Sequence, residues 1–191
     1  HTKSVSKYVG YNDAIMIYTL VPLGNPSEKY ATTRHNAGRI VVDLIKEDIQ
    51  AISACEIFVP ETFMNESGKA IAEFLRYHED REVIVVYDDK DLVLGTFRIS
   101  FDRGDGGHNG VKSVIEHLGK RDFIRIRIGI APIGTDGKDV IAPHGADVQG
   151  YVLGKLRDEE IISLREITPK VLDAIKTIAS DGYQKAMERF N

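Results

Sequence analysis

Short apolar segments alternate along the chain with segments whose apolar residues recur at helical spacing. The apolar or β-branched segments of strand length are 14–22, 55–59, 83–88, 97–101 and 123–130. Three- and four-residue spacing of apolar residues predicts helices over 36–50, 68–78 and 110–118, followed over 158–190 by one or two helices broken near Pro169. This alternation predicts a three-layer α/β/α sandwich with a mixed, mostly parallel sheet.

Composition narrows the class of protein. The 191 residues, 42% of them apolar, fit one domain, and we assign 1–191 to it. No apolar run approaches the roughly 18 residues that span a bilayer, and the polar N-terminus lacks the apolar core of a signal peptide. A lone cysteine, Cys55, cannot form an intramolecular disulfide, which favours a cytoplasmic setting. The net charge of −4 by itself disfavours a nucleic-acid partner, since lysine and arginine drive phosphate binding.

Polar residues gather in the loops that follow the predicted strands. In parallel α/β sheets, ligands bind beyond the carboxyl ends of the strands, which here points to the loops after Leu20, Val59, Tyr87 and Phe101. The residues with chemical reach in these loops are Asn25, Tyr30, His35, Phe63, Met64, Asn65, Ser67, Asp88, Asp89, Asp91, Asp102, Arg103, Asp105, His108 and Asn109. We expect a histidine, a carboxylate and three asparagines to converge on one crevice.

His35 and Asp88 are candidates for a general-base pair. A neutral imidazole can take a proton from water near pH 7, and a carboxylate on its other nitrogen fixes the tautomer. Asparagines supply uncharged donors and acceptors that can grip an amide-rich substrate and stabilise an oxyanion. Together they predict attack of water on an acyl group.

Other interpretations of the same residues remain open. His35 and Asp88 can be ordinary capping residues, and Asn25 before Pro26 is a common turn initiator. His35, Asp88 and His108 can ligate a metal, although the sequence has no HExxH motif. The Gly-, Pro- and Asp-rich segment 132–149 is predicted as an excursion near the site.

Five strings occur in an order typical of one family. They are LGNPSEKYATTRHNAG (23–38), PETFMNESGKA (60–70), VVYDDKDLVLG (85–95), GDGGHNGVKSVIEHLG (104–119) and IRIRIGI (124–130). On these motifs the sequence resembles the bacterial-type peptidyl-tRNA hydrolases. The resemblance implies a monomeric, metal-free esterase without a cofactor, which cleaves the ester bond between a peptide, or an N-blocked aminoacyl group, and the 3′ ribose of tRNA.

The resemblance also implies roles for single residues. His35 matches the catalytic base of the family, Asp88 the carboxylate that keeps it basic, and Asn25 the asparagine that distinguishes blocked from free aminoacyl-tRNA. Asn65 matches a residue near the oxyanion. The positions that match residues binding the peptide or the tRNA are Tyr30, Phe63, Asn65, Asn109 and Arg127. A guanidinium such as that of Arg127 suits a phosphate.

The sequence also departs from the family pattern. Residues 1–13 are an additional N-terminal segment, while the stretch from Asp43 to Val59 is shorter than usual, and we hypothesise that 4–12 pair as the missing strand. Ser100, Asp102 and Asp105 stand where relatives often have basic or small residues, which predicts a weak hold on the tRNA backbone.

Two further function classes share these features, a non-catalytic RNA-binding relative of the same fold and a small-molecule hydrolase. The presence of the complete site favours the enzyme over a protein that only binds RNA. Residues 94–140 hold eight Lys or Arg against six Asp or Glu, so the acidity lies outside the predicted tRNA face.

Overall fold

A five-stranded sheet forms the centre of the molecule. The structure is a computed structural model that describes residues 16–132 and 141–191. The strands are β1 (Ile17–Pro22), β2 (Cys55–Ile57), β3 (Arg81–Val93), β4 (Phe97–Ser100) and β5 (Ile124–Ala131), in the order β2-β1-β3-β5-β4. All neighbouring strands are parallel except β4, which is antiparallel to β5.

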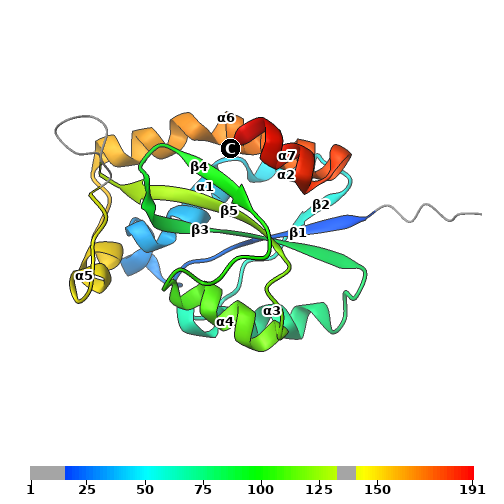
Figure 1. Cartoon of the computed structure of the whole chain (residues 1–191), viewed down its shortest axis with the longest axis horizontal. Helices are drawn as coiled ribbons and strands as arrows, with labels where there is room; N and C mark the ends of the chain where they lie inside the picture. The colour runs from blue at the N-terminus through cyan, green and yellow to red at the C-terminus, as the bar shows by residue number, and fades with distance from the viewer. Residues whose placement is uncertain (1–15, 133–140) are drawn as a thin grey trace, which may run out of the picture.

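Helices cover both faces of the sheet (Figure 1). One face carries α1 (Ala37–Leu44), α2 (Lys46–Gln50), α6 (Asp158–Asp181) and α7 (Tyr183–Phe190), and the other α3 (Ser67–Leu75) and α4 (Asn109–Leu118). Each face buries its own apolar cluster because successive strand residues point to opposite sides. The short helix α5 (Asp147–Leu153) lies at one end of the sheet (Figure 1). The predicted fold class is confirmed.

The predicted helix over 36–50 is divided at Ile45. Its φ of −123° and ψ of 14° end α1, and α2 begins at the next residue. Ile45 and Ile49 are buried, whereas Leu44, which the periodicity assigns to the same inward face, is 42% exposed. The break keeps Ile45 and Ile49 against the sheet, and a single continuous helix was therefore the wrong prediction.

Strand β3 is longer than its apolar pattern predicts. It continues beyond Asp88 to Val93, with a shift of register against β5 after Asp89. A Cβ at Gly129 would lie 2.0 Å from the carbonyl oxygen of Val93, so only glycine lets the chains approach this closely. Asp88 therefore lies within a strand and not directly after one.

The loop after Phe101 reaches the site by another route than predicted. Because β4 is antiparallel, with Ser100 opposite Arg125, this loop leaves the sheet at the end opposite to the carboxyl ends of the parallel strands. It then runs back to His108 at the start of α4.

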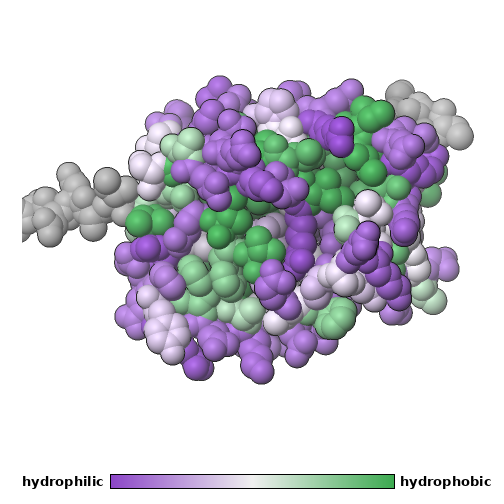
Figure 2. All heavy atoms as spheres, turned by 180° about the vertical axis from the view of Figure 1, so that it is seen from behind, coloured by the Kyte–Doolittle hydropathy of each residue, from purple (hydrophilic) through white to green (hydrophobic). Residues whose placement is uncertain are grey.

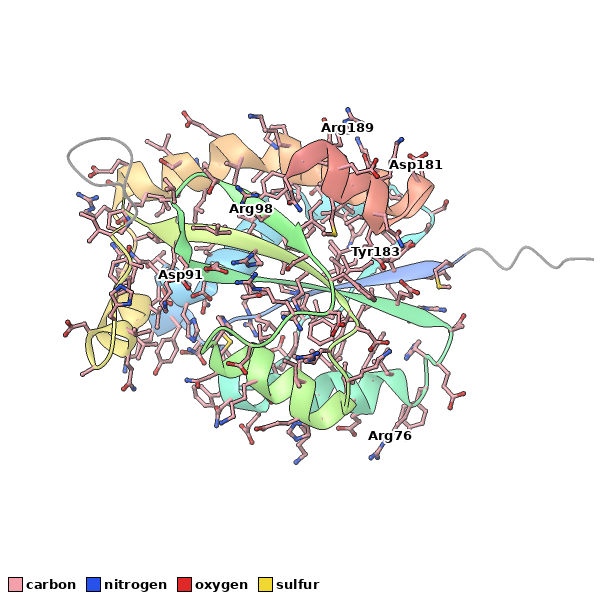
Figure 3. The ribbon with its side chains drawn as sticks, viewed as in Figure 1. Arg76, Asp91, Arg98, Asp181, Tyr183 and Arg189 are labelled. Atoms are coloured by element: carbon pink, nitrogen blue, oxygen red, sulfur yellow. The ribbon has the colours of Figure 1, made fainter. Side chains whose placement is uncertain are left out.

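Helix α6 passes through Pro169 without a break, contrary to the prediction. Proline has no N–H to donate to the carbonyl of Arg165, and the hydroxyl of Thr168 donates to that oxygen instead at 2.7 Å. The chain turns at Gly182, where φ is 86°. Beyond it Tyr183 lies toward the sheet and stacks on Phe101, whereas Arg189 projects outward (Figure 3).

Some sequence predictions fall outside the described residues. The extra segment 1–13, its hypothetical strand 4–12 and most of the first half of 132–149 are among them. The last three residues of the predicted excursion 132–149 are helical, because α5 begins at Asp147. Within 16–132 and 141–191, no helix has the length and apolar character needed to cross a membrane.

Candidate active site

A buried carboxylate lies between two imidazoles where the edge of β3 is open. β1 ends at Pro22, opposite Val86, so among the described residues no strand pairs with β3 on that side beyond this point. There Asp88, 3% exposed, accepts from Nδ1 of His35 at 2.9 and 3.0 Å, and one of its oxygens also meets Nε2 of His108 at 2.9 Å. The structure thus brings together the predicted pair and adds a second histidine to it.

Close backbone contacts bring these residues together. His35 lies in the 3₁₀ turn η2 (Arg34–Asn36), immediately before α1. A Cβ at Gly38 would be 2.3 Å from the carbonyl oxygen of Val86, so α1 approaches β3 at a distance that only glycine allows. His108 is the N-cap of α4, and its Nδ1 accepts from the N–H of Val111 at 3.2 Å.

These hydrogen bonds assign different roles to the two histidines. Because Nδ1 of His108 accepts, its proton is on Nε2 and is donated to Asp88. His35 donates from Nδ1, and its Nε2 has no hydrogen-bond partner among the described residues. The ring of His35 lines the cleft, so it can accept a proton there. His108, with both nitrogens engaged, orients Asp88.

The same contacts shift the proton affinities of the site. Burial raises the pKa of Asp88, but the two histidines outweigh this effect and hold it below its usual range. Burial lowers the pKa of His35, whereas the charge and hydrogen bonds of Asp88 raise it, and the net pKa is raised. The carboxylate is therefore ionised and His35 is a strengthened base.

A metal centre is the other arrangement that this cluster permits. Donor atoms of His35, Asp88 and His108 lie within 4.8 Å of one another. A metal needs the lone pair of an imidazole nitrogen, but both rings present an N–H to Asp88 in this hydrogen-bonding pattern. The geometry favours a proton-transfer cluster.

A cleft of about 600 Å³ opens in front of His35. All three predicted asparagines line it: Asn25, Asn65 and Asn109. Asn25 is buried, and its Oδ1 accepts from the N–H of Met64 at 2.9 Å. The side chain of Asn36 accepts from the N–H of Asn25 and donates to its carbonyl oxygen. The amide nitrogen of Asn25 has no hydrogen-bond partner in the described parts of the chain, which leaves a donor for substrate.

Not every predicted binding residue lines the cleft. Tyr30 and Phe63 pack edge to face with ring centroids 6.3 Å apart, outside the residues that surround it, and Phe63 is half exposed. Arg127 does line the cleft, but its Nε is 2.7 Å from a carboxylate oxygen of Asp89.

Sequence reasoning missed the wall that α5 contributes to the cleft. Val148, Val152 and Leu153 line it from this side. The prediction of an excursion over 132–149 missed that a helix begins at Asp147, and no element was predicted for 150–153, although the spacing of Val148, Val152 and Leu153 fits a helix.

A second hollow of about 490 Å³ lies on the other side of Asn25. Ile40, Ile57 and Val59 line it together with Arg39 and Lys46. Apolar side chains also gather across the middle of the molecule's back face (Figure 2). Neither His35 nor His108 borders this hollow, so the candidate site is the cleft in front of His35.

Comparison with known proteins decides the family. The family profile described as "Peptidyl-tRNA hydrolase" matches residues 19–191. The chain belongs to the peptidyl-tRNA hydrolase family. A protein of that name from Rubrobacter xylanophilus is 40% identical over 88% of this chain and 97% of its own length. Another from Pseudothermotoga lettingae is 38% identical over 90% and 95%.

A solved structure agrees with this result. The crystal structure of peptidyl-tRNA hydrolase from Acinetobacter baumannii superimposes with a TM-score of 0.76 at 27% identity, covering 93% of this chain and 95% of that one. The prediction of a peptidyl-tRNA hydrolase, an ester hydrolase of translation, is confirmed.

Proposed function

We propose that this peptidyl-tRNA hydrolase uses His35 as the general base in cleaving the ester between a peptide and the 3′ ribose of tRNA. The observation that carries the proposal is the buried His35–Asp88 pair, with the second imidazole nitrogen at an asparagine-lined cleft. An ester needs an activated water and a site for the oxyanion, and both kinds of group are present.

The reaction proceeds in two proton transfers. Nε2 of His35 removes a proton from water while the water oxygen attacks the ester carbonyl carbon, which forms a tetrahedral oxyanion. Asp88 stabilises the imidazolium, as its ion pair with His35 implies. The intermediate then expels the 3′ oxygen of the ribose, which takes the proton from His35. The products are free tRNA and the peptide carboxylic acid.

The asparagines hold the reacting group. Asn65, exposed on the cleft wall, donates to the oxyanion from its amide. Asn25 donates to the amide that distinguishes a peptidyl or N-blocked substrate from a free aminoacyl group. Asn109, at the start of α4, contacts the 3′ end of the tRNA.

Three residues bind substrate around this centre. Tyr30 and Phe63 offer aromatic surface outside the cleft lining, and Phe63, which is half exposed, directly precedes Met64 of the cleft wall. Arg127 contacts a tRNA phosphate from the cleft, and the carboxylate of Asp89 orients its guanidinium by accepting from Nε. No cofactor or metal takes part in this proposal.

The test is hydrolysis of N-acetyl-aminoacyl-tRNA with and without a chelator. We expect wild-type activity to survive chelation and His35→Ala to lose about 10²–10⁴ in rate. The matched control is His117→Ala, since this α4 histidine bonds only to the carbonyl oxygen of Ser113 among the described residues. Near-full activity of His35→Ala would remove the base assignment, and tRNA binding without turnover by the wild type would indicate a non-catalytic relative.

We further propose that the enzyme acts as a monomer in the cytoplasm. The substrate arises where ribosomes work, and a single chain already brings His35, Asp88 and the three asparagines to one cleft. Sedimentation equilibrium over a range of concentrations tests the monomer, and a stable dimer would contradict it.

A further inference from the structure

A second buried carboxylate lies behind the catalytic turn and takes no part in the proposed mechanism. Glu160, 4% exposed, is in the first turn of α6. Nη2 of Arg34 lies 2.8 Å from both of its carboxylate oxygens, and Nε of Arg34 is 3.2 Å from one of them. Arg34 is the residue immediately before His35.

Further contacts of Arg34 fix its position on several sides. Its guanidinium lies over the ring of Tyr151, 4.6 Å from the ring centroid, and the hydroxyl of Tyr151 donates to the carbonyl of Ile130 in β5 at 2.6 Å. The N–H of Arg34 donates to the carbonyl of Gly154 at 3.1 Å. A Cβ at Gly154 would come within 3.0 Å of Nη1 of Arg34, so glycine leaves room for the guanidinium.

We propose that Arg34 is a positioning residue for the general base, acting through Glu160 and Tyr151. The proposal rests on the assignment of His35 as the base. Asp88 holds the imidazole at Nδ1 and leaves Nε2 for the cleft. Arg34 ties the turn that carries His35 to α6 and α5, and Tyr151 in turn ties α5 to β5. Contacts from α6, from α5 and from the main chain after α5 all hold Arg34, and these contacts restrict the backbone position of His35.

The role of the Arg34–Glu160 pair is to orient the turn, because a buried ion pair often adds little to the stability of the fold. Replacing such a pair by apolar side chains of similar size often leaves stability unchanged or raised. Arginine offers a planar fork that binds a carboxylate at two points, which fixes angle as well as distance. A displacement of about 1 Å in a catalytic group can reduce a rate about 100-fold.

The kinetic consequence falls mainly on the catalytic step. Asn65 and Asn109 lie on other elements and do not hydrogen-bond to Arg34 or Glu160 within the described residues. Asn25 is linked to the turn through Asn36, whose side chain binds its main chain. Loss of the Arg34–Glu160 pair should therefore lower kcat and change KM much less.

The experiment compares four enzymes on N-acetyl-aminoacyl-tRNA. The double variant Arg34→Met/Glu160→Met removes the ion pair and keeps apolar volume, and Arg34→Lys keeps the charge without the fork. The control is Arg157→Met, because Arg157 also binds Glu160, at 3.1 Å, but is two-thirds exposed and remote in sequence from His35. Thermal unfolding is measured for each.

We expect the double variant to fold with a Tm lower by a few degrees, because Glu160 also accepts from the N–H of Arg157 at the start of α6. Its kcat should fall by about 10-fold or more, with a smaller change in KM. Arg34→Lys should show a smaller fall of the same kind, and Arg157→Met should show none. A folded double variant with wild-type kcat, or a change confined to KM, overturns the proposal. If the double variant does not fold, the kcat of Arg34→Lys decides in the same way. Failure of the base assignment is distinct, since His35→Ala would then remain active.

Discussion

At the scale of single residues, the charge and hydrogen bonds of Asp88 raise the pKa of His35, the proposed general base. Its carboxylate is almost fully buried and accepts hydrogen bonds from both histidines. A charge enclosed in this way acts strongly on its neighbours because water does not screen it. The raised pKa of His35 is the direct consequence, and it has a measurable sign.

Asp88→Asn should move the acidic limb of the pH–rate profile to lower pH. His35 is an active base only when unprotonated, so activity falls as pH falls through its raised pKa. Asparagine carries no charge to hold the proton on His35, and the pKa of His35 therefore drops. The maximal rate should also fall by about 10²–10⁴, because the tautomer is no longer fixed. A limb at unchanged or higher pH in the kcat/KM profile would contradict this account.

His108→Phe should shift the same limb in the opposite direction. The N–H of His108 shares the negative charge of Asp88, and without it the carboxylate holds the proton of His35 more tightly. We expect a shift to higher pH of up to about one unit, with most of the maximal rate retained. The same profile of His117→Phe provides the control. A loss as large as that of His35→Ala would instead make His108 the base.

The candidate site shows which residues a sequence can reveal. His35, Asp88 and the three asparagines were predicted because their motifs follow apolar strands or open helices, and these positions meet at one edge of a sheet. The pairing of Asp89 with Arg127 was not predicted, since it depends on the continuation of β3 alongside β5. The hydrogen bond between His108 and Asp88 was not predicted, because His108 follows the loop after β4 and the sequence does not specify the path of that loop.

At the scale of elements, the apolar pattern predicted those strands and helices that are buried along their length. The apolar pattern gave wrong boundaries where backbone pairing or a side-chain hydrogen bond, and not apolar burial, stabilises the element. The outer part of β3, with Asp89, Lys90 and Asp91, has no apolar period and is held by pairing with β5. Proline was expected to interrupt α6, but the hydroxyl of Thr168 satisfies the carbonyl that Pro169 leaves free.

The contact between α3 and α4 gives a prediction at this scale. A Cβ at Gly68 would lie 1.9 Å from the carbonyl oxygen of Ser113, so Gly68→Ala must push the two helices apart. We expect a loss of about 1–3 kcal/mol in the free energy of unfolding, and a lower kcat because α4 carries His108 and Asn109 at its start. Urea denaturation and the release assay measure both.

The matched control is Gly150→Ala in α5, where the new Cβ meets no heavy atom of the described residues within 4 Å apart from its chain neighbours and the helix backbone. Alanine favours a helix over glycine by up to about 1 kcal/mol, so this variant should be as stable as the wild type or more so. Equal stability of Gly68→Ala and the wild type would show that the helices do not need their close approach.

At the scale of the whole molecule, the distribution of charge determines how strongly tRNA is held. The chain is acidic overall, and residues 94–140 have a small basic excess. Much of that excess is offset: Arg127, the proposed phosphate contact, shares its charge with Asp89, Arg121 pairs with Asp102, and Arg125 is fully buried. Arg98 on β4 (Figure 3) donates to the main-chain oxygen of Asn191. Few cations in the described part of 94–140 therefore remain to neutralise phosphates.

Binding of tRNA should therefore depend only moderately on salt. Each neutralised phosphate contributes about −0.7 to −0.9 to the slope of log affinity against log salt, and we expect a total slope between about −1 and −3. Asp102→Asn provides the matched comparison, because it frees Arg121, 3.4 Å away, and asparagine tolerates the φ of 45° at this position. Its slope should be steeper by up to about one unit. Filter binding of the inactive His35→Ala enzyme to N-acetyl-aminoacyl-tRNA measures both slopes without turnover. A slope steeper than about −5 without Asp102→Asn would mean that tRNA is held mainly through its phosphates, and the asparagine-lined cleft would then contribute little to affinity.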